Sequence, residues 1–290
     1  MTVTIGVVGS INLDLVASGA PLPTAGETVT GAHFAQHPGG KGANQALAAR
    51  RLGAEVHMVG SVGDDALAEP ALELLRKDGV QVGNVMSEIG TSTGVALIAV
   101  SPEGENQITV ASGANARIGR SDVGGLPKCD VILCQLEVPV AAVEAAADLA
   151  AETGALLAIN LAPALTVPRD LIDRADLLIV NQVEAEFYGD VLHHDGGMVA
   201  LTLGGEGAAL FKQGREIARV PAFAVEVVDT TGAGDTFCGA LAVALAEGEP
   251  AEQALRFASA AAALTVTKPG AQPSLPWRDA VTDLLDEQAS

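Results

Sequence analysis

Aromatic side chains are scarce in this sequence, since only 3% of its 290 residues are Phe, Trp or Tyr. Basic residues are also few: 16 Lys and Arg stand against 36 Asp and Glu, and the formal net charge is −20 at pH 7. A nucleic-acid-binding surface needs cations for the phosphates and often aromatic rings for the bases, and an anionic membrane repels an acidic chain. Both shortages argue against nucleic acid and membrane as partners.

Cysteines and long apolar runs are equally sparse. Cys129, Cys134 and Cys238 form no CxxC pair, so we expect reduced structural thiols and neither a disulfide framework nor a zinc site. No apolar run approaches the length of about 18 residues that predicts a membrane span. The N-terminal segment MTVTIGVVGS lacks the basic and apolar regions of a signal peptide. These observations predict a cytoplasmic location.

The residues that are abundant predict a large α/β core. Hydrophobic residues make up 49% of the chain, and strand-like apolar runs alternate with helical patterns. The expected strands are 2–9, 55–60, 130–134, 155–160, 176–180 and 198–203, and the expected helices are 41–52, 65–77, 139–152, 233–246, 250–266 and 276–287. Such alternation predicts a three-layer αβα fold with a mostly parallel central sheet. We expect a single domain over residues 1–290.

Two stretches, about residues 15–37 and 91–111, break the alternation. Both have β-propensity and turn residues without an intervening helical pattern. They predict a small β-sheet that projects from the main domain as a lid.

The most informative segment is VDTTGAGDTF, residues 228–237. We expect a β-run over 223–228 to lead into its glycine turn and a helix to leave it. Glycines allow a ligand to approach the backbone, and the free N–H groups of a first helical turn favour an anion. Asp235 in this turn is a candidate general base, although an aspartate here can also simply cap a helix. A P-loop is absent, and GSINLD replaces the GxGxxG that a dehydrogenase would carry after its first strand.

Two further polar clusters support a ligand site. The segment PGGKGAN, residues 38–44, opens a helix with Gly39, Gly40, Lys41 and Asn44, although a lysine in such a loop can also be merely solvated. The segment GSINLD follows the first strand, and ligands bind at the carboxyl ends of strands in an open parallel sheet. Asn and Asp side chains there suit sugar hydroxyls.

Taken together, these segments resemble the ribokinase-like (PfkB-type) carbohydrate kinases in order and over nearly the whole chain. The resemblance includes GSINLD (9–14), PTAGETVTG (23–31), GGKGANQALAA (39–49), STGVALI (92–98), SGANA (112–116), QLEVP (135–139), NQVEAE (181–186), TLGGEG (202–207), VDTTGAGDTFCGAL (228–241) and KPGAQPSLPW (268–277). GGKGAN, GAGDTF and GAQPS in one chain form a highly specific combination. The resemblance implies the ribokinase-like fold and ATP-dependent phosphorylation of a sugar.

The resemblance also implies the roles of individual residues. Sugar hydroxyls would be held by Asn12, Asp14, Gly40, Lys41, Asn44, Glu137 and Asp235. Asp235 would take the hydroxyl proton, while the amides of Gly232, Ala233, Gly234 and Asp235 hold the transferring phosphoryl group. ATP contacts are implied at Asn181, Thr202, Leu203, Gly204, Gly205, Glu206, Gly207, Gly234 and Asp235, with Asn181 and Glu184 associated with magnesium and phosphate. A potassium ion would be surrounded by Asp229, Thr231, Thr265, Lys268, Gly270 and Ser274, and several of its ligands would be backbone carbonyls.

Within the family, the sugar-side motifs favour D-ribose, phosphorylated at O5 to D-ribose 5-phosphate for pentose phosphate and nucleotide synthesis. A kinase for another furanose, such as deoxyribose, a ketohexose or a nucleoside, is the alternative. A non-catalytic sugar-sensing protein would be expected to lack the base, and Asp235 is present. The family and the exposed face of the lid together predict a homodimer through the lid.

One segment departs from the family pattern. Only residues 187–197, FYGDVLHHDGG, separate the NxxE element from the next expected strand, where family members usually have an extra helix and strand. This leaves the adenine contacts open and predicts a trimmed sheet edge. His193 and His194 in this segment are interpreted as solvated loop residues and not as ligands.

Overall fold

The computed structural model describes residues 2–193 and 196–288. Its centre is a nine-stranded sheet with the order β13-β12-β11-β10-β9-β8-β1-β4-β5. All neighbours from β11 to β5 are parallel, whereas β12 and β13 form an antiparallel edge. The strands are β1 (Thr4–Val8), β4 (Glu55–Gly63), β5 (Gln81–Glu88), β8 (Val131–Gln135), β9 (Leu156–Asn160), β10 (Leu177–Asn181), β11 (Met198–Thr202), β12 (Ala208–Lys212) and β13 (Arg215–Val220).

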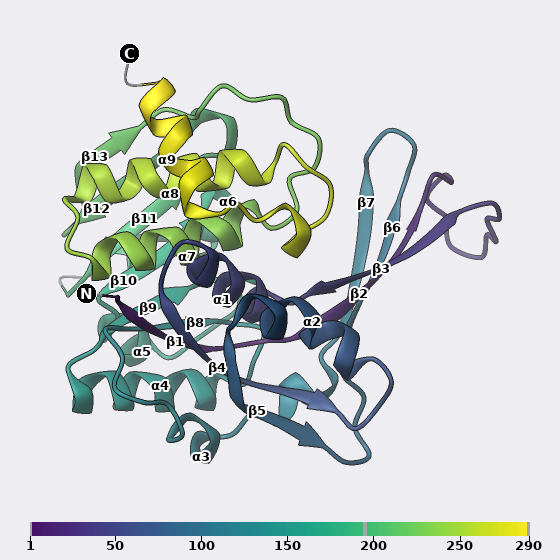
Figure 1. The fold of residues 1–290 in the computed structure, drawn as a ribbon, viewed down its shortest axis with the longest axis horizontal. Helices are drawn as coiled ribbons and strands as arrows, with labels where there is room; N and C mark the ends of the chain where they lie inside the picture. Colours follow the sequence, from purple (N-terminus) through teal and green to yellow (C-terminus); the bar gives the residue numbers. More distant parts are fainter. Residues whose placement is uncertain (1, 194–195, 289–290) are drawn as a thin grey trace.

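Helices cover both faces of this sheet (Figure 1). The helices α1 (Lys41–Arg51), α2 (Ala68–Asp78), α7 (Ala233–Ala246), α8 (Ala251–Thr265) and α9 (Arg278–Glu287) share one buried core with the sheet. The helices α3 (Arg120–Val123), α4 (Val140–Thr153) and α5 (Arg169–Asp173) contribute to a second core on the opposite face. The predicted three-layer αβα fold with a mostly parallel sheet is therefore confirmed.

Alanine allows the first core to pack closely. Ala46 on α1, Ala240 on α7 and Ala258 on α8 are each fully buried. Small side chains let helices approach one another and the sheet without gaps, and close packing at near-crystalline density supplies much of the stabilisation of a core. This close approach brings the amino-terminal turns of α1 and α7 together.

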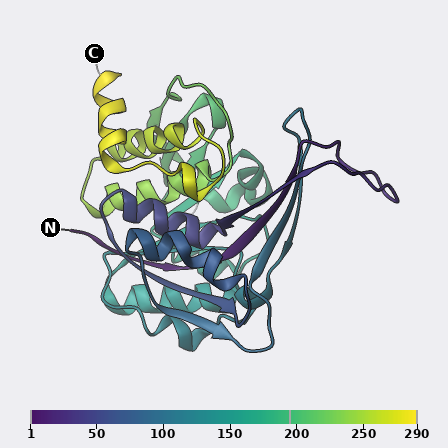
Figure 2. The same ribbon diagram turned by 45° about the vertical axis from the view of Figure 1, so that its right-hand side comes forward.

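The second, smaller sheet has the order β3-β2-β6-β7 and projects away from the main body (Figures 1 and 2). Its strands are β2 (Asn12–Ser18), β3 (His33–Gly39), β6 (Gly94–Val100) and β7 (Asn106–Ala111). They coincide closely with the two stretches that break the helix–strand alternation in the sequence. The base of β2 directly follows β1, so the lid grows from the carboxyl edge of the central sheet.

One expected strand is wrong. Residues 223–228 do not pair as a strand; β13 ends at Val220, and the chain continues as an irregular segment to the start of α7. β13 is the edge strand, and Pro221 just after it has no N–H to extend a ladder. The segment instead crosses from the sheet edge to α8, where the Val228 N–H donates to the Val266 carbonyl at 2.7 Å. The apolar composition of the segment thus reflects a cavity wall and not a strand.

The short segment after the NxxE element links neighbouring strands compactly. Helix α6 (Gln182–Tyr188) follows β10, a 3-10 turn spans Gly189–His193, and β11 then pairs beside β10 in parallel. The sheet therefore continues across this point with a single helix as the crossover. His193 is exposed, as expected of a solvated loop residue; His194 lies outside the described residues.

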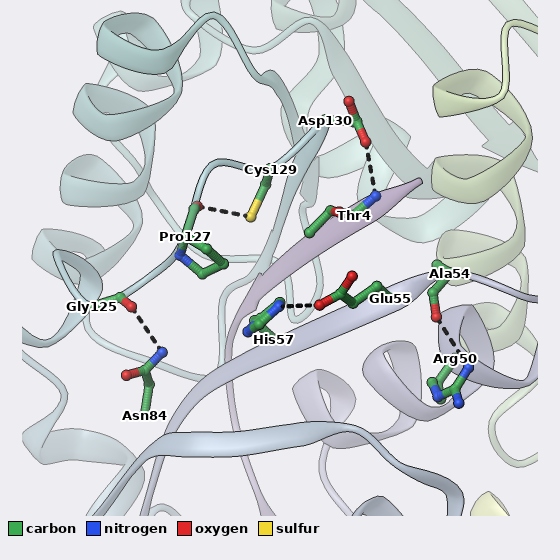
Figure 3. A network of polar contacts seen from close by, with 10 residues as sticks. All are labelled: Thr4, Arg50, Ala54, Glu55, His57, Asn84, Gly125, Pro127, Cys129 and Asp130. Carbon is green, nitrogen blue, oxygen red and sulfur yellow. Dashed lines mark hydrogen bonds and ion pairs between the residues drawn. The ribbon is translucent and has the colours of Figure 1, made fainter. Parts of the chain in front are cut away.

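The amino-terminal edge of the central sheet carries contacts that fasten loops to strands (Figure 3). The Thr4 N–H donates to Asp130 Oδ2 at 2.8 Å and joins β1 to the start of β8, while the Asn84 amide donates to the Gly125 carbonyl at 3.0 Å. The three cysteines are free and buried, as expected. Among the described residues, no helix is long and apolar enough to cross a membrane.

Candidate active site

A polar cavity of about 240 Å³ lies at the carboxyl edge of the sheet, where α1 and α7 begin. Residues from five sequence segments line it, in agreement with the rule that ligands of open parallel sheets bind at this edge. The lining residues include Lys41, Asn160, Asn181, Glu184, Thr202, Thr230, Gly232, Gly234, Asp235 and Cys238. Segments nearly 200 positions apart therefore share one cavity.

Asp235 stands in the first turn of α7 and is 7% exposed. Gly232, the residue before the helix, has a φ of 81° in the left-handed region, which glycine adopts without a Cβ clash. The turn places the carboxylate beside the helix N-terminus, where free N–H groups and the helix dipole favour negative charge. Two amides of α1 also hold it: Asn44 Nδ2 donates to Oδ2 at 2.9 Å, and Gln45 Nε2 donates to Oδ1 at 3.0 Å.

The residues predicted to bind the sugar are held by a network of hydrogen bonds around the start of α1. Glu137 Oε2 accepts a hydrogen bond from the Ser10 hydroxyl at 2.6 Å and from the Lys41 backbone N–H at 3.1 Å. Gly40 precedes the helix with a φ of 89°, and a Cβ there would lie 2.7 Å from the Asn12 nitrogen. Only glycine lets the segment 39–44 lie this close to the strand that carries Asn12 and Asp14.

Asn12 is oriented by a residue to which we had assigned no role. The Asn115 amide donates to Asn12 Oδ1 at 2.8 Å and to the Ile11 carbonyl at 3.1 Å, and its own oxygen accepts the Ile11 N–H at 2.9 Å. Asn115 is 1% exposed and lies in the SGANA segment. A fully bonded buried amide of this kind fixes its neighbours in one arrangement.

Charges of both signs meet in this region. Burial, together with the nearby carboxylates of Glu137 and Asp235, raises the pKa of Asp14 to about 7. The negative charge of Asp235, with those of Glu137 and Glu184, raises the pKa of Lys41, although burial opposes this. Lys41 is therefore a cation at neutral pH inside an acidic protein. Such a cation attracts an anionic substrate locally, against the field of the whole molecule.

A second, more apolar cavity of about 440 Å³ adjoins the first through shared residues Thr202, Thr230 and Gly234. Gly204, Gly205 and Gly207 line it, together with Phe223, Val225, Val227, Phe237, Ser259, Ala262, Ala263 and Val266. Leu203 and Glu206 lie in the same segment but line neither of these two cavities. The residues 223–227 that we expected in a strand thus form one wall of this cavity.

The NxxE element forms the amino-terminal cap of α6. The Asn181 side chain accepts the Glu184 N–H at 2.9 Å, and Glu184 Oε2 accepts the Asn181 N–H at 2.8 Å. This reciprocal pair is a capping box. Both residues also line the polar cavity, so the cap points their side chains toward it.

Only three of the six residues expected around a cation are joined to one another through the Asp229 carboxylate, and the other three have different partners. Asp229, Thr231 and Gly270 are joined by hydrogen bonds, which link the turn before α7 to the loop 268–274. The Thr265 hydroxyl instead pairs with that of Thr236 at 2.8 Å, and the Ser274 hydroxyl donates to the Ala271 carbonyl at 2.7 Å. Lys268 is exposed, and its backbone N–H contacts the Thr265 carbonyl.

A carboxylate at a helix N-terminus, beside a partly buried lysine and two joined cavities, fits the transfer of a phosphoryl group to a hydroxyl. The sequence matches the pfkB family carbohydrate kinase model over residues 4–278. The chain therefore belongs to the pfkB family of carbohydrate kinases.

Within this family, the chain is similar to ribokinases. It is 40% identical to the ribokinase of Bacillus subtilis, with 96% of this chain and 98% of that protein covered. It is 36% identical to the ribokinase of Haemophilus influenzae, with 99% of each covered. The structure of Arabidopsis thaliana ribokinase complexed with ribose and ATP superimposes with a TM-score of 0.87 at 34% identity and covers 98% of this chain and 99% of that one.

Gln45 is another site residue that the sequence motifs did not single out. It follows Asn44 in GGKGANQ, but residues adjacent on a helix point about 100° apart, so the motif alone does not indicate that both side chains reach one carboxylate. A buried glutamine on an otherwise apolar stretch was the available signal, because such a side chain needs a partner.

Proposed function

We propose that the chain transfers the γ-phosphoryl group of ATP to O5 of D-ribose and releases D-ribose 5-phosphate and ADP. The observation that carries this proposal is the position of Asp235: it is buried at the start of α7 and bound by two amides of α1, the helix that GGKGAN opens. Sugar-side and phosphate-side elements thus converge on one carboxylate. The similarity to ribokinases over nearly the whole chain supports ribose as the sugar.

In the proposed mechanism, ribose binds near Asn12, Asp14, Lys41 and Glu137, and its O5 hydroxyl donates to Asp235. Asp235 accepts the proton as O5 attacks the γ-phosphorus. The developing negative charge meets the N–H groups of Gly232, Ala233 and Gly234 at the start of α7 and the ammonium of Lys41. Most of the rate enhancement in such a reaction comes from alignment and charge stabilisation.

The larger, apolar cavity suits the adenine ring, and the segment 202–207 lies between it and the polar cavity. We assign the ATP base to this cavity and its phosphates to the boundary near Gly234. The walls Phe223, Val225 and Val227 come from the irregular segment before α7. We propose this position for adenine although the segment 187–197 is short.

Magnesium would be held chiefly by ATP. Among the described residues, no three His, Cys, Asp or Glu side chains gather as a metal site. Magnesium at nucleotide sites commonly uses one or two carboxylates, phosphate oxygens and water. Glu184 and Asn181 at the wall of the polar cavity could supply the protein ligands to this magnesium. The ion would neutralise charge on the phosphates.

We also propose a potassium site between the Asp229 turn and the loop 268–274. Asp229 supplies a carboxylate, and the surrounding loop supplies the backbone carbonyls that an alkali cation binds through oxygen. The Asp229 side chain already joins the turn to the loop, because it accepts hydrogen bonds from Thr231 and Gly270. A cation there would set the geometry of the anion-binding turn without contacting ATP.

A homodimer through the lid completes the proposal. In the strand register, Val110 pairs with Ala96 and Ala96 with Asp14, so Val110 shares a sheet face with the sugar-side carboxylate. Ile108, on the same face, is 56% exposed, and Val110 is 47% exposed. Apolar side chains exposed on a projecting sheet fit association with a second lid. The variant Ile108→Glu should shift sedimentation toward monomer, whereas Phe34→Glu, on the opposite face, should not.

A cytoplasmic location fits the free, buried cysteines, which persist in a reducing compartment. The substrate assignment is tested with a panel of ribose, 2-deoxyribose, fructose and a nucleoside, each with Mg-ATP, by following ADP release. Ribose should give the highest kcat/KM, since a missing hydroxyl leaves buried polar groups unpaired and can reduce it by orders of magnitude. A clear preference for fructose or a nucleoside would refute ribose as the substrate but leave a sugar kinase.

A further inference from the structure

Gln45 is a fully buried side chain on α1 that contacts the carboxylate at the centre of the site. Its Nε2 donates to Asp235 Oδ1 at 3.0 Å, while the neighbouring Asn44 donates to Oδ2 at 2.9 Å. Each carboxylate oxygen is thus held by one amide. Hydrogen bonds to an ionised acceptor are stronger than those between neutral groups.

The crossing of α1 and α7 makes this contact possible. Gly239 lies one helical turn after Asp235, and a Cβ there would lie 2.8 Å from the Gln45 carbonyl oxygen and 3.0 Å from the Ala48 Cβ. Any larger residue would push the helices apart and move the Gln45 amide away from Asp235. The close crossing and the hydrogen bond therefore belong to one arrangement.

Stability alone does not explain a glutamine at this position. Its Oε1 atom is buried and has no hydrogen-bond partner among the described residues. A buried amide oxygen without a partner is unfavourable, and an apolar side chain of similar size would fill the same volume without that cost. The residue is consequently explained better by what its Nε2 does than by packing.

We propose that Gln45 is a positioning residue that fixes the rotation of the Asp235 carboxylate for catalysis; this inference rests on the proposed function of Asp235 as the base. A carboxylate held at one oxygen can rotate about its Cβ–Cγ bond. Donors on both oxygens stop this rotation and leave the remaining lone pairs directed to the sugar hydroxyl. Small displacements of a reacting group can reduce the rate strongly.

The first test replaces Gln45 by methionine, which has a similar size but no donor. We expect Gln45→Met to lower kcat by about tenfold to a hundredfold, the range for loss of a hydrogen bond to a charged group. The KM values for ribose and ATP should stay within about twofold, because the side chain contacts the base and not either substrate. If Gln45→Met does not fold, Gln45→Asn is tested in its place, since it keeps the amide but is one methylene too short to reach Asp235. It should likewise lower kcat and leave both KM values nearly unchanged.

The matched control is Leu47→Ala, a fully buried position on the same helix. It should lower the melting temperature at least as much as Gln45→Met does, yet keep kcat within about twofold per folded enzyme. An equal kcat loss in Leu47→Ala would show that general loosening of α1 explains the effect, and would overturn the proposal. So would a Gln45→Met enzyme that retains wild-type kcat.

The decisive measurement is a double-mutant cycle with Asp235→Asn. Gln45→Met should have little further effect in that background, because it acts through the carboxylate. An undiminished effect there would refute a role through Asp235. Wild-type turnover with the sugar panel and the rate of Asp235→Asn alone are measured first. If Asp235→Asn is itself nearly fully active, the proposed function of Asp235 fails, which is distinguishable from failure of the Gln45 inference.

Discussion

Asp229 Oδ2 accepts a hydrogen bond from the backbone N–H of Gly270 at 2.8 Å, although 41 positions separate the two residues. Oδ1 of the same carboxylate accepts the N–H and the hydroxyl of Thr231 at 2.9 and 2.7 Å. Burial acts to raise the pKa of Asp229, but the hydrogen bonds from Thr231 and Gly270, with the nearby His37, outweigh it and lower the pKa. An ionised side chain thus ties the glycine turn before α7 to the loop 268–274.

This link predicts a dependence on monovalent cations. The wild-type kcat, measured as the rate of ADP release, should be higher in potassium than in sodium at constant ionic strength. In Asp229→Asn the two salts should give the same, lower rate, because the carboxylate that would bind the cation is gone. Equal rates of the wild type in both salts would remove the cation site from the proposal.

The second prediction concerns Asp235. Asp235→Asn keeps the size of the side chain but cannot accept the hydroxyl proton, and loss of a general base typically lowers the rate by about 10² to 10⁴. We expect a kcat loss of at least that order, with ribose and ATP affinities by calorimetry changed little. An Asn variant that keeps more than about a tenth of wild-type kcat would make Asp235 a helix cap.

The third prediction follows from the raised pKa of Asp14, about 7 against an ordinary value of 3.8. Between these two pH values the folded state binds a proton that the unfolded state has lost, so stability falls as pH rises through this window. Asp14→Asn carries no charge at any pH. Relative to wild type it should be more stable at pH 8, by roughly 1–3 kcal/mol, and show little advantage below pH 4.

Urea unfolding of both proteins across pH 4 to 8 measures this difference. Besides burial, the charges of Glu137 and Asp235 disfavour the ionised form of Asp14, and His37 lies opposite Asp14 in the register of β2 and β3. Because salt screens interactions between charges, the buffer series is kept at constant ionic strength. A stability difference that does not change with pH would show that Asp14 titrates normally. The same variant should lose ribose affinity if Asp14 contacts a hydroxyl.

The fourth prediction concerns Arg51, which joins α1 to the C-terminal loop. Its Nε donates to Asp78 at 2.7 Å, and its NH1 donates to the Gln272 and Leu275 carbonyls at 2.8 Å each. Arg51 and Asp78 are 8% and 9% exposed, so Arg51→Met leaves a buried carboxylate unpaired. We expect a loss of about 3–5 kcal/mol of unfolding free energy.

Arg51→Lys should recover only part of this loss, since an ammonium cannot reproduce the planar fork of a guanidinium. Asp78→Asn is the control, because it removes the charge but leaves the two carbonyl contacts; it should destabilise less than Arg51→Met. Chemical denaturation of the three variants ranks them. A reversed ranking would place the main stabilisation in the ion pair and not in the loop contacts.

Much of the fold could be predicted because its signals are local. The period and length of apolar runs gave most strands and helices, including α7 at its observed bounds, since strand alternation and helix starts depend on near neighbours. The run 223–228 misled the prediction because apolar, β-branched residues suit a cavity wall as well as a strand. Strands β5 and β13 were not assigned because edge strands carry mixed, partly exposed patterns; β12 was not assigned either, although it is largely buried.

By itself, the sequence determined the class of fold, the lid, and the glycine turn that holds Asp235, because these depend on short stretches with strong local preferences. The motifs and their order along the chain also indicated the family. The tertiary structure alone decided that Gln45 reaches Asp235, that Asn115 orients Asn12, and that Asp229 bonds Gly270. Each of these contacts joins segments between 41 and 190 positions apart, and the path of the whole chain brings them within hydrogen-bonding distance.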